Sequence, residues 1–103
     1  MTTTNEHEIS AATLRIAGMQ ANGVASFRRL RAEIPGQISL SAADWEPSIT
    51  RNGEPMWHQI VRNIKSHSTI ENNYIADGLL EHVPRVGYRI TPAGRHFLAS
   101  GRS

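Results

Sequence analysis

The chain has 103 residues and no cysteine, and its 11 lysine and arginine residues against 9 aspartate and glutamate residues give a formal net charge of +2. This length fits one small domain and excludes a two-domain enzyme with a separate cofactor-binding lobe. The lack of cysteine excludes disulfide scaffolds, zinc knuckles, iron–sulfur sites and thiol nucleophiles. No apolar run approaches the roughly 18–20 residues of a membrane span, and the N-terminus does not resemble a secretory signal. We therefore expect a cytoplasmic protein with no membrane partner.

The basic residues are almost all arginine, since Lys65 is the only lysine. Residues 82–103 contain four arginines and no acidic residue. Arginine is suited to phosphate groups and to guanine edges, so this composition favours a nucleic-acid partner, although a GC-rich genome also raises arginine content.

Two helices are predicted in the first part of the chain, after a flexible N-terminus over residues 1–8. Ser10 is the expected N-cap of the first, with Ile9 and Leu14 as a hydrophobic staple, and Asn22-Gly23 should end it. Ser26 is the expected N-cap of the second, which Pro35-Gly36 should stop.

A short turn and a loop should follow. Leu40 and Trp45 are spaced as a second staple around Ser41, with Asp44 at the third helical position and Pro47 ending the turn. Residues 49–54 read as a loop.

The third helix has the clearest pattern in the chain, with Pro55 suited to its first position. Trp57, Ile60, Val61 and Ile64 form an i, i+3, i+4, i+7 stripe that must be buried. The opposite face carries His58, Gln59, Arg62, Asn63, Lys65 and Ser66.

The last third predicts a helical turn over residues 74–77 closed by Gly78, then a hairpin and a helix. Residues 79–83 and 87–90 read as strands around the loop 84–86, with Tyr88 and Ile90 inward. Thr91 and Pro92 should cap and begin a helix that runs to Gly101. A short segment at Val24 could add a third strand.

The aromatic residues are expected in the core rather than on a base-stacking surface: Trp45, Trp57, Tyr74 and Phe97. Other expected core residues are Phe27, Leu30, Leu79, Ile90 and Leu98.

The order of these elements predicts an α+β, mainly helical fold over residues 9–103. The predicted architecture is a winged helix-turn-helix, with a three-helix bundle, a β-hairpin wing and a C-terminal helix.

The run Gly78-Leu79-Leu80, followed after the hairpin by Tyr88-Arg89-Ile90-Thr91-Pro92-Ala93-Gly94-Arg95, resembles the end of many winged-helix proteins. The segment 51–67 (RNGEPMWHQIVRNIKSH) resembles the N-terminal module of Mrr-type restriction endonucleases. Those proteins usually carry a nuclease domain after the module, whereas this sequence stops at Ser103, so the resemblance implies DNA recognition without cleavage.

The polar face of the third helix is the candidate reader of the major groove, because amides suit adenine and arginine or lysine suits guanine. Arg62 and Asn63 are the predicted readers, and no acidic residue occurs from Pro55 through Ile70. Lys65, Arg85 at the hairpin tip and Arg89 are expected mainly on the DNA backbone. The full predicted DNA-binding set is Arg51, His58, Gln59, Arg62, Asn63, Lys65, Ser66, Arg85 and Arg89. An ordinary solvated helix face remains the alternative.

No constellation in the sequence predicts catalysis, a metal site or a cofactor. The 5 histidines are scattered without ligand spacing, and no glycine-rich phosphate loop occurs. The favoured hypothesis is a sequence-specific double-stranded DNA-binding protein, such as a small transcriptional regulator or nucleoid-associated factor, with homodimerisation left open. A recognition module for a nuclease or modification partner, and a winged helix used for protein–protein contact, are the alternatives.

Overall fold

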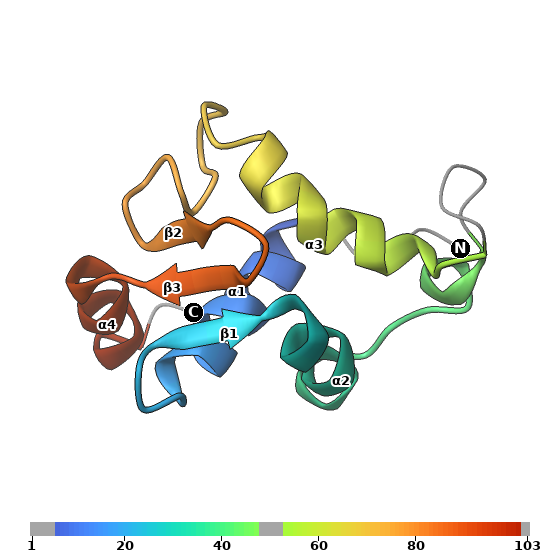
Figure 1. The fold of residues 1–103 in the computed structure, drawn as a ribbon, viewed down its shortest axis with the longest axis horizontal. Helices are drawn as coiled ribbons and strands as arrows, with labels where there is room; N and C mark the ends of the chain where they lie inside the picture. The colour runs from blue at the N-terminus through green and yellow to red at the C-terminus, as the bar shows by residue number, and fades with distance from the viewer. Residues whose placement is uncertain (1–5, 48–52, 102–103) are drawn as a thin grey trace.

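The computed structural model describes residues 6–47 and 53–101. Among these residues it contains four α-helices, a short 3-10 helix and a three-stranded antiparallel sheet (Figure 1). The elements in chain order are α1 (Glu6–Gly18), β1 (Val24–Ser26), α2 (Phe27–Gln37), η1 (Ala43–Trp45), α3 (Met56–Ser66), β2 (Leu80–Val83), β3 (Gly87–Ile90) and α4 (Pro92–Ala99). The predicted order of elements is therefore confirmed.

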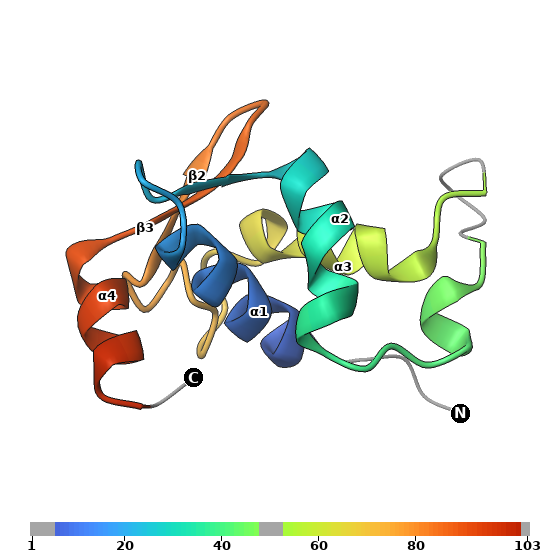
Figure 2. The same cartoon turned by 90° about the horizontal axis from the view of Figure 1, so that it is seen from below.

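Helix α1 is the centre of the molecule, in contact with α2, α3, α4 and strands β1 and β3 (Figure 2). Its residues from Ile9 to Leu14 are all buried, so it is apolar around most of its circumference. The prediction of Ser10 as N-cap is wrong, because Ser10 lies inside the helix and is 3% exposed. Residues 6–8, predicted as part of a flexible N-terminus, are helical, and the helix ends at Gly18 rather than at Asn22-Gly23.

Helix α2 begins where predicted, because the Ser26 hydroxyl accepts a 3.0 Å hydrogen bond from the Arg29 N–H. It does not stop at Pro35-Gly36 but continues to Gln37. Pro35 lies in the last turns of the helix and lacks the N–H that would bond to the carbonyl of Arg31, which is an exposed residue. The missing bond is therefore tolerated.

In the turn before α3 the N-cap of η1 is Ala42 rather than Ser41, but Ser41 and Asp44 are hydrogen-bonded to each other. The Asp44 carboxylate accepts a 2.7 Å hydrogen bond from the Ser41 N–H, and the Asp44 N–H donates to the Ser41 hydroxyl. Trp45, predicted as core, is instead 49% exposed and packs edge-to-face on Trp57 with ring centroids 5.7 Å apart. The end of this turn at Pro47 pairs with Pro55 in an antiparallel bridge, and most of the predicted loop 49–54 lies outside the described residues.

The stripe of α3 is buried as expected at Trp57, Val61 and Ile64, whereas Ile60 is only partly buried against the core. Pro55 is the N-cap rather than the first helical residue, a shift of one position. Tyr74 and the predicted residues Leu30, Leu79 and Ile90 are also buried, while Phe27, Phe97 and Leu98 pack against the core from its edge.

The sheet has the strand order β1-β3-β2, so the segment at Val24 does add the third strand. Tyr88 and Ile90 are buried and Arg89 between them is exposed, as the alternation predicted. Gly87 pairs with Ser26, and a Cβ at Gly87 would lie 2.0 Å from the Ala25 carbonyl oxygen. Glycine is therefore required there for β1 to approach β3.

The segments around the hairpin also match the sequence pattern. The predicted helical turn at residues 74–77 is a hydrogen-bonded turn closed by Gly78, whose φ is +77°. Thr91 caps α4 through a 2.9 Å hydrogen bond from the Gly94 N–H, and α4 ends at Ala99, two residues before Gly101. This α+β arrangement is compatible with the expected winged helix.

Candidate nucleic-acid interface

The polar side of α3 is partly exposed to solvent. His58, Gln59, Arg62, Asn63 and Lys65 are half-buried, and Ser66 is exposed. Of the other predicted residues, Arg85 at the hairpin tip is exposed, and Arg89 is exposed on β3 with its guanidinium 3.7 Å from the Glu81 carboxylate. Arg51 lies outside the described residues. The structure therefore brings six of the predicted residues together on one helix, with the hairpin beside it (Figure 1).

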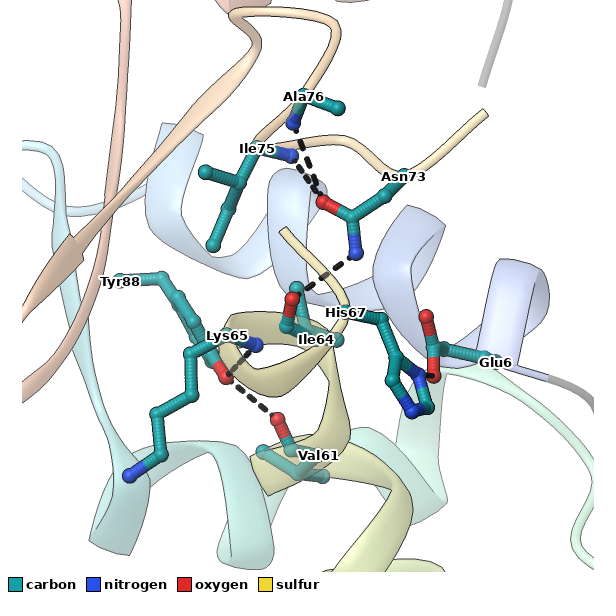
Figure 3. Close-up of polar contacts among 9 residues, drawn as sticks. All are labelled: Glu6, Val61, Ile64, Lys65, His67, Asn73, Ile75, Ala76 and Tyr88. Atoms are coloured by element: carbon teal, nitrogen blue, oxygen red, sulfur yellow. Dashed lines mark hydrogen bonds and ion pairs between the residues drawn. The ribbon is translucent and has the colours of Figure 1, made fainter. Parts of the chain in front are cut away.

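The hairpin is attached to α3 through the phenol of Tyr88. Its hydroxyl donates a 2.6 Å hydrogen bond to the Val61 carbonyl and accepts a 3.2 Å bond from the Lys65 N–H (Figure 3). Burial raises the pKa of this phenol far above its ordinary value, so it stays protonated and remains a donor. The sequence predicted Tyr88 as core but not this polar contact.

The C-terminal end of α3 is fixed by Asn73, which sequence reasoning did not single out. Its side-chain N–H donates a 2.9 Å hydrogen bond to the Ile64 carbonyl, and its side-chain oxygen accepts from the Ile75 and Ala76 N–H groups (Figure 3). The Asn72-Asn73 pair was the available signal, because asparagine commonly bonds to backbone N–H groups two or three residues onward. In the same figure the His67 ring lies 2.7 Å from a Glu6 carboxylate oxygen, which joins this end of α3 to α1.

The start of α2 lies between α3 and the hairpin. The Phe27 N–H donates a 2.7 Å hydrogen bond to the Val86 carbonyl, next to the hairpin tip. The ammonium of Lys65 lies 5.3 Å from the centroid of the Phe27 ring. Lys65 is also close enough to His82 on β2 to lower the pKa of that imidazole, together with the larger effect of burial. Lys65 is thus placed at the junction of all three elements.

Arg62, one of the two predicted readers, is paired with Glu54. The two terminal guanidinium nitrogens donate to the two carboxylate oxygens, each at 2.7 Å, and the side chains are only 20% and 22% exposed. The stretch without acidic residues begins at Pro55. Glu54 lies immediately before this stretch and is paired with Arg62, eight residues later in the chain. The charge of Arg62 is therefore compensated by a carboxylate just outside that stretch.

The same carboxylate affects His58, whose Nδ1 lies 3.4 Å from a Glu54 oxygen. The hydrogen bond from Arg62 holds the pKa of Glu54 below its ordinary value, so this carboxyl group is ionised at pH 7. Burial lowers the pKa of His58 in spite of Glu54, and the charge of Arg31 adds to this effect. His58 is therefore neutral at pH 7 and does not act as the cation that the sequence suggested.

Helix α2 supplies two further cations. Arg28 and Arg31 are exposed, lie three residues apart and form no ion pair within the described part of the chain, whereas Arg29 is paired with Glu33. Helices α2 and α3 are in contact, and the charge of Arg31 on α2 contributes to the lowered pKa of His58 on α3. We call the side chains of Arg28, Arg31, Lys65 and Arg85, with the exposed side of α3 between them, the basic surface.

Other kinds of site find less support. Within residues 6–47 and 53–101, no group of three or more histidine, aspartate or glutamate side chains is arranged to hold a metal ion. None of the helices in those ranges is long and apolar enough to span a membrane.

Comparison of the chain with models of protein families, with curated proteins and with solved structures found no match. The function is therefore inferred from the residues of the basic surface and from the elements that position them.

Proposed function

We propose that the protein binds double-stranded DNA, with α3 in the major groove and the hairpin against the backbone or the minor groove. The observation that carries the proposal is the basic surface itself. An amphipathic helix lies beside a hairpin, and α2, α3 and the hairpin tip, which are in contact with one another, each carry cations. The major groove of duplex DNA is wide enough for one helix, and phosphates flank it on both sides. Elements that lie beside the helix in the groove can contact these phosphates.

In this proposal the fold is a winged helix, and the resemblance to the Mrr-type N-terminal module is part of it. The support is the element order, with three helices followed by a hairpin that is hydrogen-bonded to the third helix through Tyr88. Tyr88 bonds to Val61 and Lys65, and Asn73 bonds to Ile64. The C-terminal half of α3 is therefore presented as a rigid unit. A rigid reading element loses less entropy on binding than a flexible one.

The residues divide by their chemistry. Asn63, with no side-chain partner among the described residues, and Gln59 are the amides placed to contact base edges. The four cations of the basic surface neutralise phosphates: Arg28, Arg31, Lys65 and Arg85. Arg89 and Ser66 make additional backbone contacts at the edge of this surface. The protein acts as a small regulator or nucleoid-associated factor, or as the recognition module of a nuclease or modification enzyme, and such a partner would supply the cleavage chemistry.

A specific observation favours protein–protein contact as the second candidate function. Trp45 is 49% exposed although it contacts the buried Trp57. Exposed tryptophan is common at the centre of protein interfaces. This contact would lie at the N-terminal end of α3 and could coexist with DNA binding.

The experiment is a fluorescence anisotropy titration of a random-sequence duplex with the wild-type protein, Lys65→Gln and Arg95→Gln. Arg95 lies on α4, where its guanidinium is near the Gly18 carbonyl and away from α3, so it is a control for the loss of one charge. We expect Lys65→Gln to weaken binding and to reduce the slope of log K against log salt by about 0.9, the value for one phosphate contact. Equal effects of the two substitutions would contradict the proposal, and Trp45→Ala should leave duplex binding unchanged.

A further inference from the structure

We propose that Glu54 determines the specificity of the basic surface by positioning Arg62 and by reducing its attraction for phosphate. This inference rests on the proposed function. It concerns a residue that sequence reasoning did not select, since an acidic side chain beside a DNA-binding helix opposes binding to a polyanion.

The geometry of the pair is the first step. Each terminal nitrogen of Arg62 donates one 2.7 Å hydrogen bond to Glu54, and each carries a second N–H that this pair does not use. The Nε atom of Arg62 is buried and has no hydrogen-bond partner among the described residues, so within that part of the chain the guanidinium is oriented by its two bonds to Glu54. Glu54 therefore fixes the direction in which the remaining terminal N–H groups point.

The charge of the pair is the second step. Glu54 is ionised at pH 7, so the pair is neutral, and its atoms are about four-fifths shielded from solvent. A phosphate that approached Arg62 would also approach the Glu54 carboxylate, and like charges at short range in a partly buried site repel strongly. A neutral acceptor does not meet this repulsion. Guanine offers two neutral acceptors, N7 and O6, on its major-groove edge.

The pair therefore favours a base edge over the backbone. The other cations of the basic surface, Lys65, Arg28 and Arg31, supply the phosphate contacts that Arg62 does not. Specificity is a difference between two affinities, and a repulsive element against the wrong ligand increases it as effectively as a new attraction to the right one. Glu54 has this repulsive role toward phosphate.

The test uses Glu54→Gln, which removes the charge and keeps the shape of the side chain. The matched control is Glu46→Gln, because Glu46 is exposed, its side chain forms no ion pair among the described residues, and its carbonyl accepts a hydrogen bond from Met56 at the start of α3. Both variants change the net charge by the same amount near the same end of α3. Thermal unfolding of each variant establishes that it is folded before binding is measured.

Two readouts are compared: affinity for a random duplex, and the consensus selected from a randomised duplex pool. We expect Glu54→Gln to bind random duplex at least about threefold more tightly than Glu46→Gln, with a salt slope steeper by about 0.9. The wild-type consensus should contain a fixed guanine that becomes degenerate in Glu54→Gln. Arg62→Gln should lose the same guanine without the gain in random-duplex affinity.

Either of two results overturns the inference while leaving DNA binding intact. One is the same random-duplex affinity for Glu54→Gln and Glu46→Gln, and the other is an unchanged consensus in Glu54→Gln. If the wild-type protein binds no duplex, the proposed function fails and the inference fails with it, and this result is distinct from the other two.

Discussion

The hydroxyl of Tyr88 bridges two backbone groups of α3, since it donates to the Val61 carbonyl at 2.6 Å and accepts from the Lys65 N–H at 3.2 Å. Val61 and Lys65 are four residues apart, the spacing at which α-helical carbonyl and N–H groups pair. The middle strand of the sheet is thereby joined to the helix that we propose to enter the groove. This bridge is one of the contacts that set the orientation of the hairpin relative to α3.

Tyr88→Phe should lower the free energy of unfolding by about 1–3 kcal/mol, because it removes a buried donor and leaves the Val61 carbonyl with one partner fewer. Urea denaturation followed by far-UV circular dichroism measures this change. Duplex affinity should also fall, because the angle between the hairpin and α3 is no longer fixed. Unchanged stability would show that the bridge contributes nothing beyond packing of the ring.

The stripe of α3 gives a second prediction, from two isoleucines that differ in burial. Ile64→Ala should cost about 2–5 kcal/mol of unfolding free energy, since Ile64 is fully buried and leaves a cavity. Ile60→Ala should cost clearly less, because Ile60 is only partly buried. Paired urea titrations compare them, and an equal cost at the two positions would contradict the burial described for α3.

The hairpin tip gives a third prediction, in which stability and binding change in opposite directions. Arg85 has a φ of +65°, the left-handed region, in a turn closed by a 3.0 Å hydrogen bond from the Val86 N–H to the Val83 carbonyl. A non-glycine residue there is strained by about 1 kcal/mol. Arg85→Gly should therefore raise the melting temperature and weaken binding to all duplexes alike. A variant that is less stable than the wild type would refute the strain, and unchanged duplex affinity would remove Arg85 from the basic surface.

The Glu54 cluster gives a fourth prediction, on pH. The pKa of Glu54 is lowered by Arg62, so its stabilising contribution is present above the unfolded value of 4.5 and is lost as the pH falls through the folded value. Burial lowers the pKa of His58, which changes stability in the same direction. The protein loses this contribution to stability as the pH falls below 6.5, the value of the unfolded imidazole. Between pH 6 and pH 3 the wild type should lose more stability than Glu54→Gln, as urea titrations at each pH would show. Parallel pH profiles would mean that the pair does not contribute to folding.

The order of elements could be predicted from the sequence because their signals are local. Ser26 and Thr91 are caps whose bonding partners lie three residues onward, and the alternation of Tyr88, Arg89 and Ile90 follows from the period of a strand. The start of α1 was predicted wrongly for a related reason. Helix α1 is buried on most sides, so its sequence has no polar face whose limits would mark the ends of the helix. The sequence therefore predicts Ser10, a residue inside the helix, as its N-cap.

The candidate site was less predictable, because its decisive contacts join residues of different elements. Glu54 precedes α3, so its pairing with Arg62 depends on how the chain enters the helix at Pro55, which helical spacing alone does not fix. The Glu6 to His67 contact joins residues 61 positions apart, and no periodicity encodes it. The sequence therefore indicated which face of α3 is polar, but not that Arg62 is neutralised there.

The measurement that tests the central claim most directly is a titration of the wild-type protein against a random-sequence duplex of about 20–30 base pairs over a series of salt concentrations. If four cations of the basic surface contact phosphates, log K should fall linearly with log salt, with a slope of about −3 to −4. Lys65→Gln and Arg28→Gln should each reduce its magnitude, and Arg95→Gln should not. No binding at the lowest salt, or binding that does not depend on salt, would contradict the account.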